Sequence, residues 1–431
     1  MNNKLWILLI TLNIAVVNKI CSVTPLGMLT PYDINIRFKK PAPHHFYFNV
    51  MGEKSYNVKG YATDDCLEKS FLTNPLQIYE NQQNIISMYQ GIDNQGNVEI
   101  ISAPFTQLLD SIAGGAGGGV SNLENGLFTP TGKFCAGQVA FSGMYALGHD
   151  LFISAHLPVY FVKLHCVDWQ YSGNNELFSG ARIQEELVST FTQDAKNIFN
   201  LNVEGWKKHG PGDLTLLLEW QKDFPQRRQM LKNVQSNIRL GLSLPTGCKA
   251  DETVLMSTPF GADGSVGVPF GGGLGMNLAN CAEIGFSGQF WYFWSNEKER
   301  RIKSFPTQTT LLLPLITHAT REYSFTQNFN LYAKVFSLCK KFTLKFGYQY
   351  WRRGEDVITP TNTNFYHEVV NSDLRLQETT KHFVLLALTY SPLSNDFKKV
   401  VPQLQLFWKG AVKGSRSAIA STAGAQFSLI F

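Results

Sequence analysis

The stretch Lys341-Phe-Thr-Leu-Lys-Phe-Gly-Tyr-Gln-Tyr350 alternates apolar and polar side chains along its whole length. Because successive side chains of a β-strand point to opposite faces, an extended chain here has one apolar face and one polar face. The apolar face carries Phe342, Leu344, Phe346, Tyr348 and Tyr350, and the polar face carries Lys341, Thr343, Lys345, Gly347 and Gln349. The pattern predicts a strand that meets a different environment on each side.

The same alternation recurs in other parts of the chain. The further segments are 153–161, 214–220, 237–244, 283–294, 328–335 and 403–408. A soluble sandwich would turn the apolar faces into a core, whereas an outer-membrane barrel would turn them to lipid and line its interior with the polar faces. Segment lengths of about ten residues match strands that cross a bilayer at a tilt. Aromatic clusters at 290–294, 348–351 and 407–408 match interfacial girdles, so the barrel is favoured.

The composition excludes several other classes of protein. Of the 431 residues only 16% are charged, whereas 44% are hydrophobic and 13% are aromatic. An ordinary soluble domain has roughly 25% charged residues. The aromatic content argues against disorder, and a net charge of +5 is no nucleic-acid footprint. No apolar run outside the N-terminus approaches the roughly 20 residues of a transmembrane helix.

The N-terminus has the pattern of a secretory signal peptide. Lys4 precedes an apolar run over residues 6–17, which is too short for a comfortable membrane span. We therefore expect a signal peptide over residues 1–22 and a periplasmic N-terminal segment over residues 23–45. Residues 46–431 are then the transmembrane barrel.

The C-terminus resembles the last strand of Gram-negative outer-membrane β-barrels. Phe427, Leu429 and Phe431 alternate on one face, and Phe431 is the final residue. The resemblance implies that these three residues are an assembly signal for the barrel-assembly machinery, and that lipids of a Gram-negative outer membrane surround the protein. Segments 213–220 and 329–334 also look like strands of uncharacterised barrels of intracellular bacteria, which implies no particular function.

Counting strands backwards from Phe431 predicts about twelve, since such barrels have an even number. The fold class is all-β, a transmembrane antiparallel up-and-down β-barrel with long outer loops. The predicted strands are 46–62, 134–145, 150–163, 213–223, 234–245, 266–278, 283–295, 324–337, 341–352, 380–390, 401–410 and 421–431. The long connections then all fall on the outer side, at 63–133, 164–212, 246–265, 296–323, 353–379 and 411–420.

Three stretches within these outer loops carry expectations of their own. Segment 309–316 has the composition of a strand, but Pro314 and the strand parity favour an outer loop that folds inward. The long first excursion, 63–133, contains a glycine run at 114–119 and either constricts the barrel or packs on its surface. Residues 181–199 have apolar side chains at helical spacing and predict a short helix.

The sequence shows no catalytic, metal or cofactor motif. Segment 367–371 lacks the second histidine of a zinc-protease helix, and Gly271–Gly275 is followed by Met276 where a dinucleotide fingerprint needs glycine. The seven cysteines lie far apart without a Cys-x-x-Cys pair. The compact His-x-Ser pattern of the outer-membrane phospholipase is also absent. We therefore expect no enzyme, no cofactor and no metal site.

The polar faces of the predicted strands define the candidate site, which is a polar, mildly basic lumen. The predicted lumen residues are Arg239, Lys334, Lys341, Lys345, Lys409, Glu219, Glu283, Gln289, Asn328, Asn330, Gln349, Gln403 and Gln405. A basic excess would bias a water-filled pore towards anions, whereas a plugged and internally paired network would not conduct.

The predicted function is an outer-membrane channel or passive transporter for small hydrophilic solutes or anions, with no nucleic-acid partner. One alternative is a surface-exposed barrel whose loops bind a host or another partner without transport. A less favoured alternative is an outer-membrane lipid hydrolase.

Overall fold

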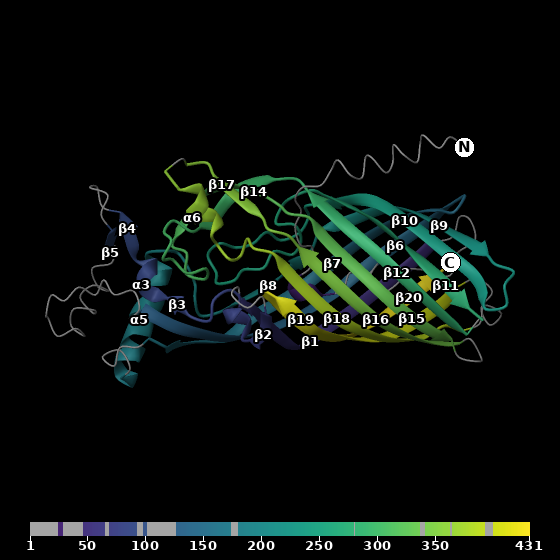
Figure 1. Ribbon diagram of the computed structural model, residues 1–431, viewed down its shortest axis with the longest axis horizontal. Coiled ribbons are helices and arrows are strands. Elements are labelled where there is room, and N and C mark those ends of the chain that lie inside the picture. Colours follow the sequence, from purple (N-terminus) through teal and green to yellow (C-terminus); the bar gives the residue numbers. More distant parts are fainter. Residues whose placement is uncertain are drawn as a thin grey trace.

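Twelve antiparallel strands form a closed barrel in the computed structural model (Figure 1). The structure describes residues 25–28, 46–64, 69–92, 98–100, 126–173, 180–279, 281–336, 341–362, 364–392 and 400–431. The barrel strands are β1 (Phe46–Asp64), β6 (Leu127–Gly148), β7 (Leu151–Tyr171), β9 (Leu214–Pro225), β10 (Leu231–Leu244), β11 (Gly267–Leu278), β12 (Ala282–Phe293), β15 (Thr326–Phe336), β16 (Phe342–Arg353), β18 (Thr379–Tyr390), β19 (Val401–Ser415) and β20 (Ser417–Ile430). Each pairs with the next, and β1 closes the barrel by pairing with both β20 and β6. The predicted fold class is confirmed.

The barrel wall separates apolar from polar side chains by the pleat of its strands. On β10, Ile238 and Leu240 are 57% and 55% exposed on the outside, while Arg239 between them is only 3% exposed on the inside. The aromatic clusters obey the same rule. Trp294 is exposed, whereas Trp291 and Phe293 are buried, so only alternate members of that cluster contribute to an outer girdle.

The two ends of the barrel differ in the length of their connections. At one end, which also holds the C-terminus, β6 and β7 are joined by residues 149–150 and β9 and β10 by residues 226–230 (Figure 1). Among the described residues, the α-helices labelled in Figure 1 lie at or beyond the other end. The expectation that the long connections share one side is confirmed for the parts that the structure describes, but the expected loop at 411–420 was wrong, because β19 runs to Ser415 and β20 begins at Ser417. No described helix is long and apolar enough to cross a membrane.

One predicted outer loop contains an additional strand. β8 (Trp206–Pro211) pairs with β7 in a register that is offset by one residue from the β7–β9 pairing. β8 and β9 are therefore one strand interrupted by a bulge at Gly212 and Asp213. The prediction that all of 164–212 is loop was wrong for these residues.

Beyond the outer ends of the strands lies a folded region that we call the outer cap, formed by residues 69–92, 180–205, 245–266, 294–325 and 354–378. A small sheet within it consists of β13 (Asn296–Ile302), β14 (Leu315–Glu322) and β17 (Val357–Pro360). The remaining cap elements are β2 (Lys69–Thr73), η2 (Pro75–Gln77), β3 (Gln83–Asn84), α3 (Ile85–Met88), β4 (Gln90–Ile92), α5 (Ala181–Asn197) and α6 (His367–Asn371). β5 (Val98–Ile100) pairs with β4. The helix expected at 181–199 is confirmed by α5.

An apolar core joins the outer cap to the inner face of the barrel. It combines Phe134 of β6 and Tyr160 of β7 with residues of the excursion and of α5, including Leu76, Met88 and Phe191. The excursion thus fills part of the outer mouth, although its glycine run at 114–119 lies outside the described residues. Segment 309–316 forms no barrel strand, as predicted, although residues 315 and 316 begin β14 of the small cap sheet. Its residues Leu311 and Leu312 are buried in the same core.

A short N-terminal stretch lies inside the barrel rather than in the periplasm. Leu26 and Met28 of η1 (Pro25–Gly27) and its flank belong to the apolar core, and the carbonyl oxygen of Gly27 accepts a hydrogen bond of 2.7 Å from Lys409 Nζ. The expectation of a periplasmic segment over 23–45 was therefore wrong for residues 25–28, because their apolar side chains find buried contacts inside the barrel. The expected signal peptide over 1–22 lies outside the described residues.

Candidate functional site: the barrel interior and its outer mouth

Most of the predicted lumen residues have buried side chains on the inner face of the wall. These are Arg239, Lys345, Lys409, Glu219, Glu283, Gln289, Asn328, Gln349 and Gln405. Lys334, Asn330 and Gln403 are half-buried. Lys341 is also half-buried, and it lies directly before β16, which begins at Phe342.

One group of inner side chains is organised around Glu283 of β12. Its Oε1 accepts hydrogen bonds from the hydroxyl of Tyr332 at 2.8 Å and from Lys334 Nζ at 2.9 Å. The ammonium of Lys345 lies 5.1 Å from the centre of the Tyr332 ring, which also favours a cation. Gly285 lies directly across from Tyr332, and any Cβ there would collide with the Tyr332 ring. The glycine therefore makes room for the ring that links these charges.

A second inner group surrounds His156 of β7. The imidazole lies 3.0 Å from the hydroxyl groups of both Ser142 and Ser154, and Ser154 donates a hydrogen bond of 2.8 Å to Glu219. Further along the wall, Gln349 donates a hydrogen bond of 3.0 Å to Asn328. Much of the inner surface is thus paired within itself.

Two buried charged residues of the inner face were missed by the sequence prediction. Glu53 of β1 is buried and accepts a hydrogen bond of 2.8 Å from Thr422, and Lys381 of β18 lies 4.4 Å from the ring centre of Trp351. The alternation that places Phe46 and Phe48 outside would have found Glu53. Among the predicted lumen residues that lie within barrel strands, together with these two, five are basic, namely Arg239, Lys334, Lys345, Lys381 and Lys409, and three are acidic, namely Glu53, Glu219 and Glu283.

A cavity of about 250 Å³ lies at the outer mouth, between the outer cap and the upper wall. Its cationic lining is Arg300, Arg301, Arg321, Arg353, Arg375, Lys381 and Arg416, and its anionic lining is Asp251, Glu252 and Asp263. Lys381 belongs to both this cavity and the inner face of β18. The cavity therefore borders the polar inner surface of the wall.

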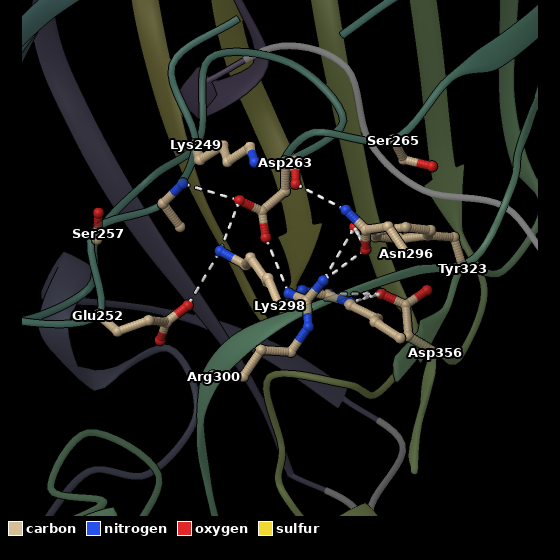
Figure 2. Close-up of polar contacts among 12 residues, drawn as sticks. Lys249, Glu252, Ser257, Asp263, Ser265, Asn296, Lys298, Arg300, Tyr323 and Asp356 are labelled. Atoms are coloured by element: carbon tan, nitrogen blue, oxygen red, sulfur yellow. Dashed lines mark hydrogen bonds and ion pairs between the residues drawn. The ribbon is translucent and has the colours of Figure 1, made fainter. Parts of the chain in front are cut away.

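Asp263 is the centre of the charged network in the outer cap (Figure 2). Its carboxylate accepts hydrogen bonds from Lys298 Nζ at 2.8 Å, from Arg300 Nη1 at 2.9 Å and from the backbone N–H of Ala250 at 2.8 Å. Burial alone would raise the pKa of Asp263, but Lys298 and Arg300 outweigh it and hold that pKa below its ordinary value. Asp263 is therefore ionised at neutral pH and fixes both cations in place.

The other cavity arginines are also held by specific partners. Arg301 donates to the carbonyl oxygens of Phe199, Asn200, Leu313 and Pro314 at 2.8 to 3.0 Å, and burial lowers its pKa to about 10. Arg321 forms an ion pair with Asp356 at 2.5 Å, as Arg375 does with Asp373 at 2.6 Å. These cations tie loops together, and the residues that line the cavity include seven basic against three acidic ones, so the lining is net positive.

The described residues contain no group of three or more histidine, cysteine, aspartate or glutamate side chains arranged to hold a metal ion. The assembly-signal residues Phe427 and Phe431 have exposed side chains on the outer face, and Leu429 between them is half-buried. The ring of Phe431 lies 6.2 Å from that of Phe46 on β1.

No family model matches this chain, and no curated protein sequence matches it. Among solved structures it is similar to the COG4313 outer membrane channel from Pseudomonas putida F1, with a TM-score of 0.48 and 12% identity over 94% of this chain and 100% of that chain. It is also similar to a Pseudomonas aeruginosa FadL homologue, with a TM-score of 0.32 and 10% identity over 96% of this chain and 98% of that one. The Ralstonia pickettii toluene transporter TbuX gives a TM-score of 0.30 and 8% identity over 90% of this chain and 89% of the transporter.

The architecture itself identifies the environment of the chain. A closed antiparallel barrel with an apolar outer belt and a polar interior is the architecture of outer-membrane proteins, because lipid replaces water around the wall. The chain has the architecture of an outer-membrane β-barrel.

Proposed function

We propose that this barrel is a passive channel for small solutes, which enter through the outer cavity and pass along a polar, mildly basic inner surface. The observation that carries the proposal is the continuity between the net-positive cavity and the inner face, which share Lys381. A basic excess of five residues against three along the wall favours small hydrophilic anions over cations.

The passage is narrow in the state described. Arg239, Lys345 and Lys409 are all at least nine-tenths buried, and the stretch around Gly27 occupies space beside Lys409. Lys409 also lies 3.7 Å from the centre of the Phe383 ring, so its ammonium is held on two sides. We infer that conduction requires the Gly27 stretch to move, and that Lys409 restrains this movement.

The proposed partners outside the lumen follow from the outer surface. Outer-membrane lipids surround the apolar belt, and the barrel-assembly machinery reads the exposed alternation of Phe427, Leu429 and Phe431. The exposed positions of the two phenylalanines support this assignment, since a recognition signal must be accessible before the strand is embedded.

Single-channel recording in planar bilayers tests the channel. The wild-type protein should give open-channel steps, and Lys409→Met should give larger or more frequent steps because the bond to Gly27 is lost. Lys222→Met is the matched control. Lys222 has an exposed side chain on β9, near the barrel end opposite the outer cap, so its replacement should leave the conductance unchanged.

A heat-dependent shift in gel mobility must first show that each variant is folded. A folded wild-type barrel that stays silent in the bilayer would refute transport and would favour a role for the outer cap in binding a partner. Equal conductance of Lys409→Met and the wild type would leave the channel in place but reject the restraint by Lys409.

A further inference from the structure

Three lysines form an exposed basic surface on the outside of the barrel wall, which we call the outer lysine patch. They are Lys133 of β6, Lys163 of β7 and Lys207 of β8. Lys163 lies directly across from Lys207 in the β7–β8 pairing, and Lys133 lies directly across from His165 in the β6–β7 pairing. Two like charges placed directly opposite each other on neighbouring strands destabilise a sheet unless something neutralises them.

The described residues supply no neutralising carboxylate to this patch. Within the described part of the chain, none of the three lysine amines has a carboxylate within 4.0 Å. β6 and β8 contain no acidic residue, and the single one in β7, Asp168, accepts a hydrogen bond from Gln170. The remaining titratable groups on this face are His165 and His209, which become cationic when protonated, and the thiols of Cys135 and Cys166.

The position of the patch on the wall indicates what covers it. On β7 the outward residues below Lys163 are apolar, ending with Phe161, which is 49% exposed. His209 of β8 lies directly across from Phe161. The patch therefore begins where the lipid-facing belt ends, at the outer end of the barrel. A molecule that occupies it meets lysine amines on one part of its surface and the apolar belt on the other.

Another part of the outer rim shows the usual arrangement. Arg352 of β16 is partly exposed near the same end of the barrel, and it forms an ion pair with Glu378 at 2.5 Å. The contrast shows that the fold can pair a rim cation with its own acid. At the outer lysine patch no described acid takes this place, so the lysines are open to an anion from outside.

We propose that the outer lysine patch binds the phosphate groups of a lipid headgroup in the outer leaflet. Lysine ammonium groups are compact, rotatable donors that suit phosphate oxygens, and the phosphate relieves the repulsion between Lys163 and Lys207. The acyl chains of the same lipid lie against the belt that ends at Phe161. This contact favours a membrane lipid over free phosphate, and it is independent of whether the barrel conducts.

The test is binding of fluorescent lipid A that carries two phosphates to the full-length folded protein in detergent. The wild type should bind it, and Lys163→Gln with Lys207→Gln should weaken the affinity about 10- to 30-fold, from the loss of two cation contacts. Lys163→Arg with Lys207→Arg should retain the binding. Lys222→Gln with Lys232→Gln removes the same charge at the opposite end of the barrel and should have no effect.

Three outcomes would overturn the assignment, provided that the gel shift confirms folding. The first is equal affinity of the wild type and the glutamine double variant. The second is equal affinity of the wild type for lipid A and for lipid A stripped of its phosphates. The third is binding of inorganic phosphate alone to the patch as tightly as lipid A, which would assign the site to a free anion.

Discussion

The barrel wall and the outer cap bury opposite kinds of side chain. In the wall, apolar residues such as Leu331 face outwards and charged residues such as Glu283 are buried inside. In the cap, apolar residues such as Leu312 form the core, and the buried charges around Asp263 form a paired network. The wall is thus built to be stable against lipid, whereas the cap is built like a water-soluble domain. The two regions should therefore respond differently to the same kind of substitution.

The largest effect is expected from Asp263→Ala in the cap. The change leaves Lys298 and Arg300 without their shared carboxylate, and breaking a buried ion pair in this way costs about 3–5 kcal/mol. Hydrogen exchange should accelerate in residues 246–265 and in β13, while the gel shift of the barrel persists. Glu299→Ala removes an exposed acid of β13, the strand that carries Lys298 and Arg300; it is the control and should change little. Loss of the gel shift in Asp263→Ala would show that wall and cap are one cooperative unit.

A charge on the lipid face should destabilise the wall without opening the cap. Leu331 is 56% exposed near the middle of β15, so Leu331→Arg should cost about 2–4 kcal/mol in a bilayer. Asn330→Arg, one residue away on the inner face, should be tolerated. Urea unfolding in lipid vesicles measures both variants. Equal destabilisation by the two changes would mean that the assigned facing of β15 is wrong.

A smaller effect is expected where a glycine admits Tyr332. Gly285→Val should push the Tyr332 ring away from Glu283 and cost about 1–3 kcal/mol through overpacking. Urea unfolding in lipid vesicles should show partial recovery when Tyr332→Ala is added to Gly285→Val. If Tyr332→Ala gives no recovery, the collision with this ring is not the cause.

The smallest effect on the stability of the cap is expected from lowering the pH. The pKa of Asp263 in the folded protein lies below its ordinary value of 3.8, so its ionised form stabilises the cap fully above pH 3.8. That contribution is lost as the pH falls through the lowered pKa. Protease cleavage of the cap should therefore be unchanged between pH 7 and pH 5 and should rise below about pH 4. Asp263→Asn should abolish this rise, and an unaltered acid response in that variant would assign the transition to other groups.

The wall could be predicted from the sequence because its information is local. Each strand, such as β16, shows its two faces by simple alternation, and all twelve predicted strands are present. The failures are instructive. β8 was missed because the bulge at Gly212 and Asp213 shifts the alternation by one residue. Even-numbered residues such as Lys208 face inwards before the bulge, and odd-numbered residues such as Thr215 face inwards after it. Alternation also does not fix where a strand begins, and β16 begins at Phe342, one residue after the predicted start.

The cap could not be predicted in the same way. Asp263 and Arg300 are 37 residues apart, and their contact has no periodic signal in the sequence. The bond between Lys409 and Gly27 spans 382 residues and depends on a stretch too short to show any period. Such contacts form only when the closed barrel brings distant loops to the same mouth, so the cavity is a product of the tertiary fold.

The most direct test of the central claim is the reversal potential of the wild-type channel in a planar bilayer with a tenfold gradient of potassium chloride. The net-positive mouth and inner surface predict a potential that reports preference for chloride. Lys345→Glu with Arg239→Glu should move it towards preference for potassium. A cation-preferring wild type, or a potential that this charge reversal does not move, would contradict the assignment of these residues to the conduction path.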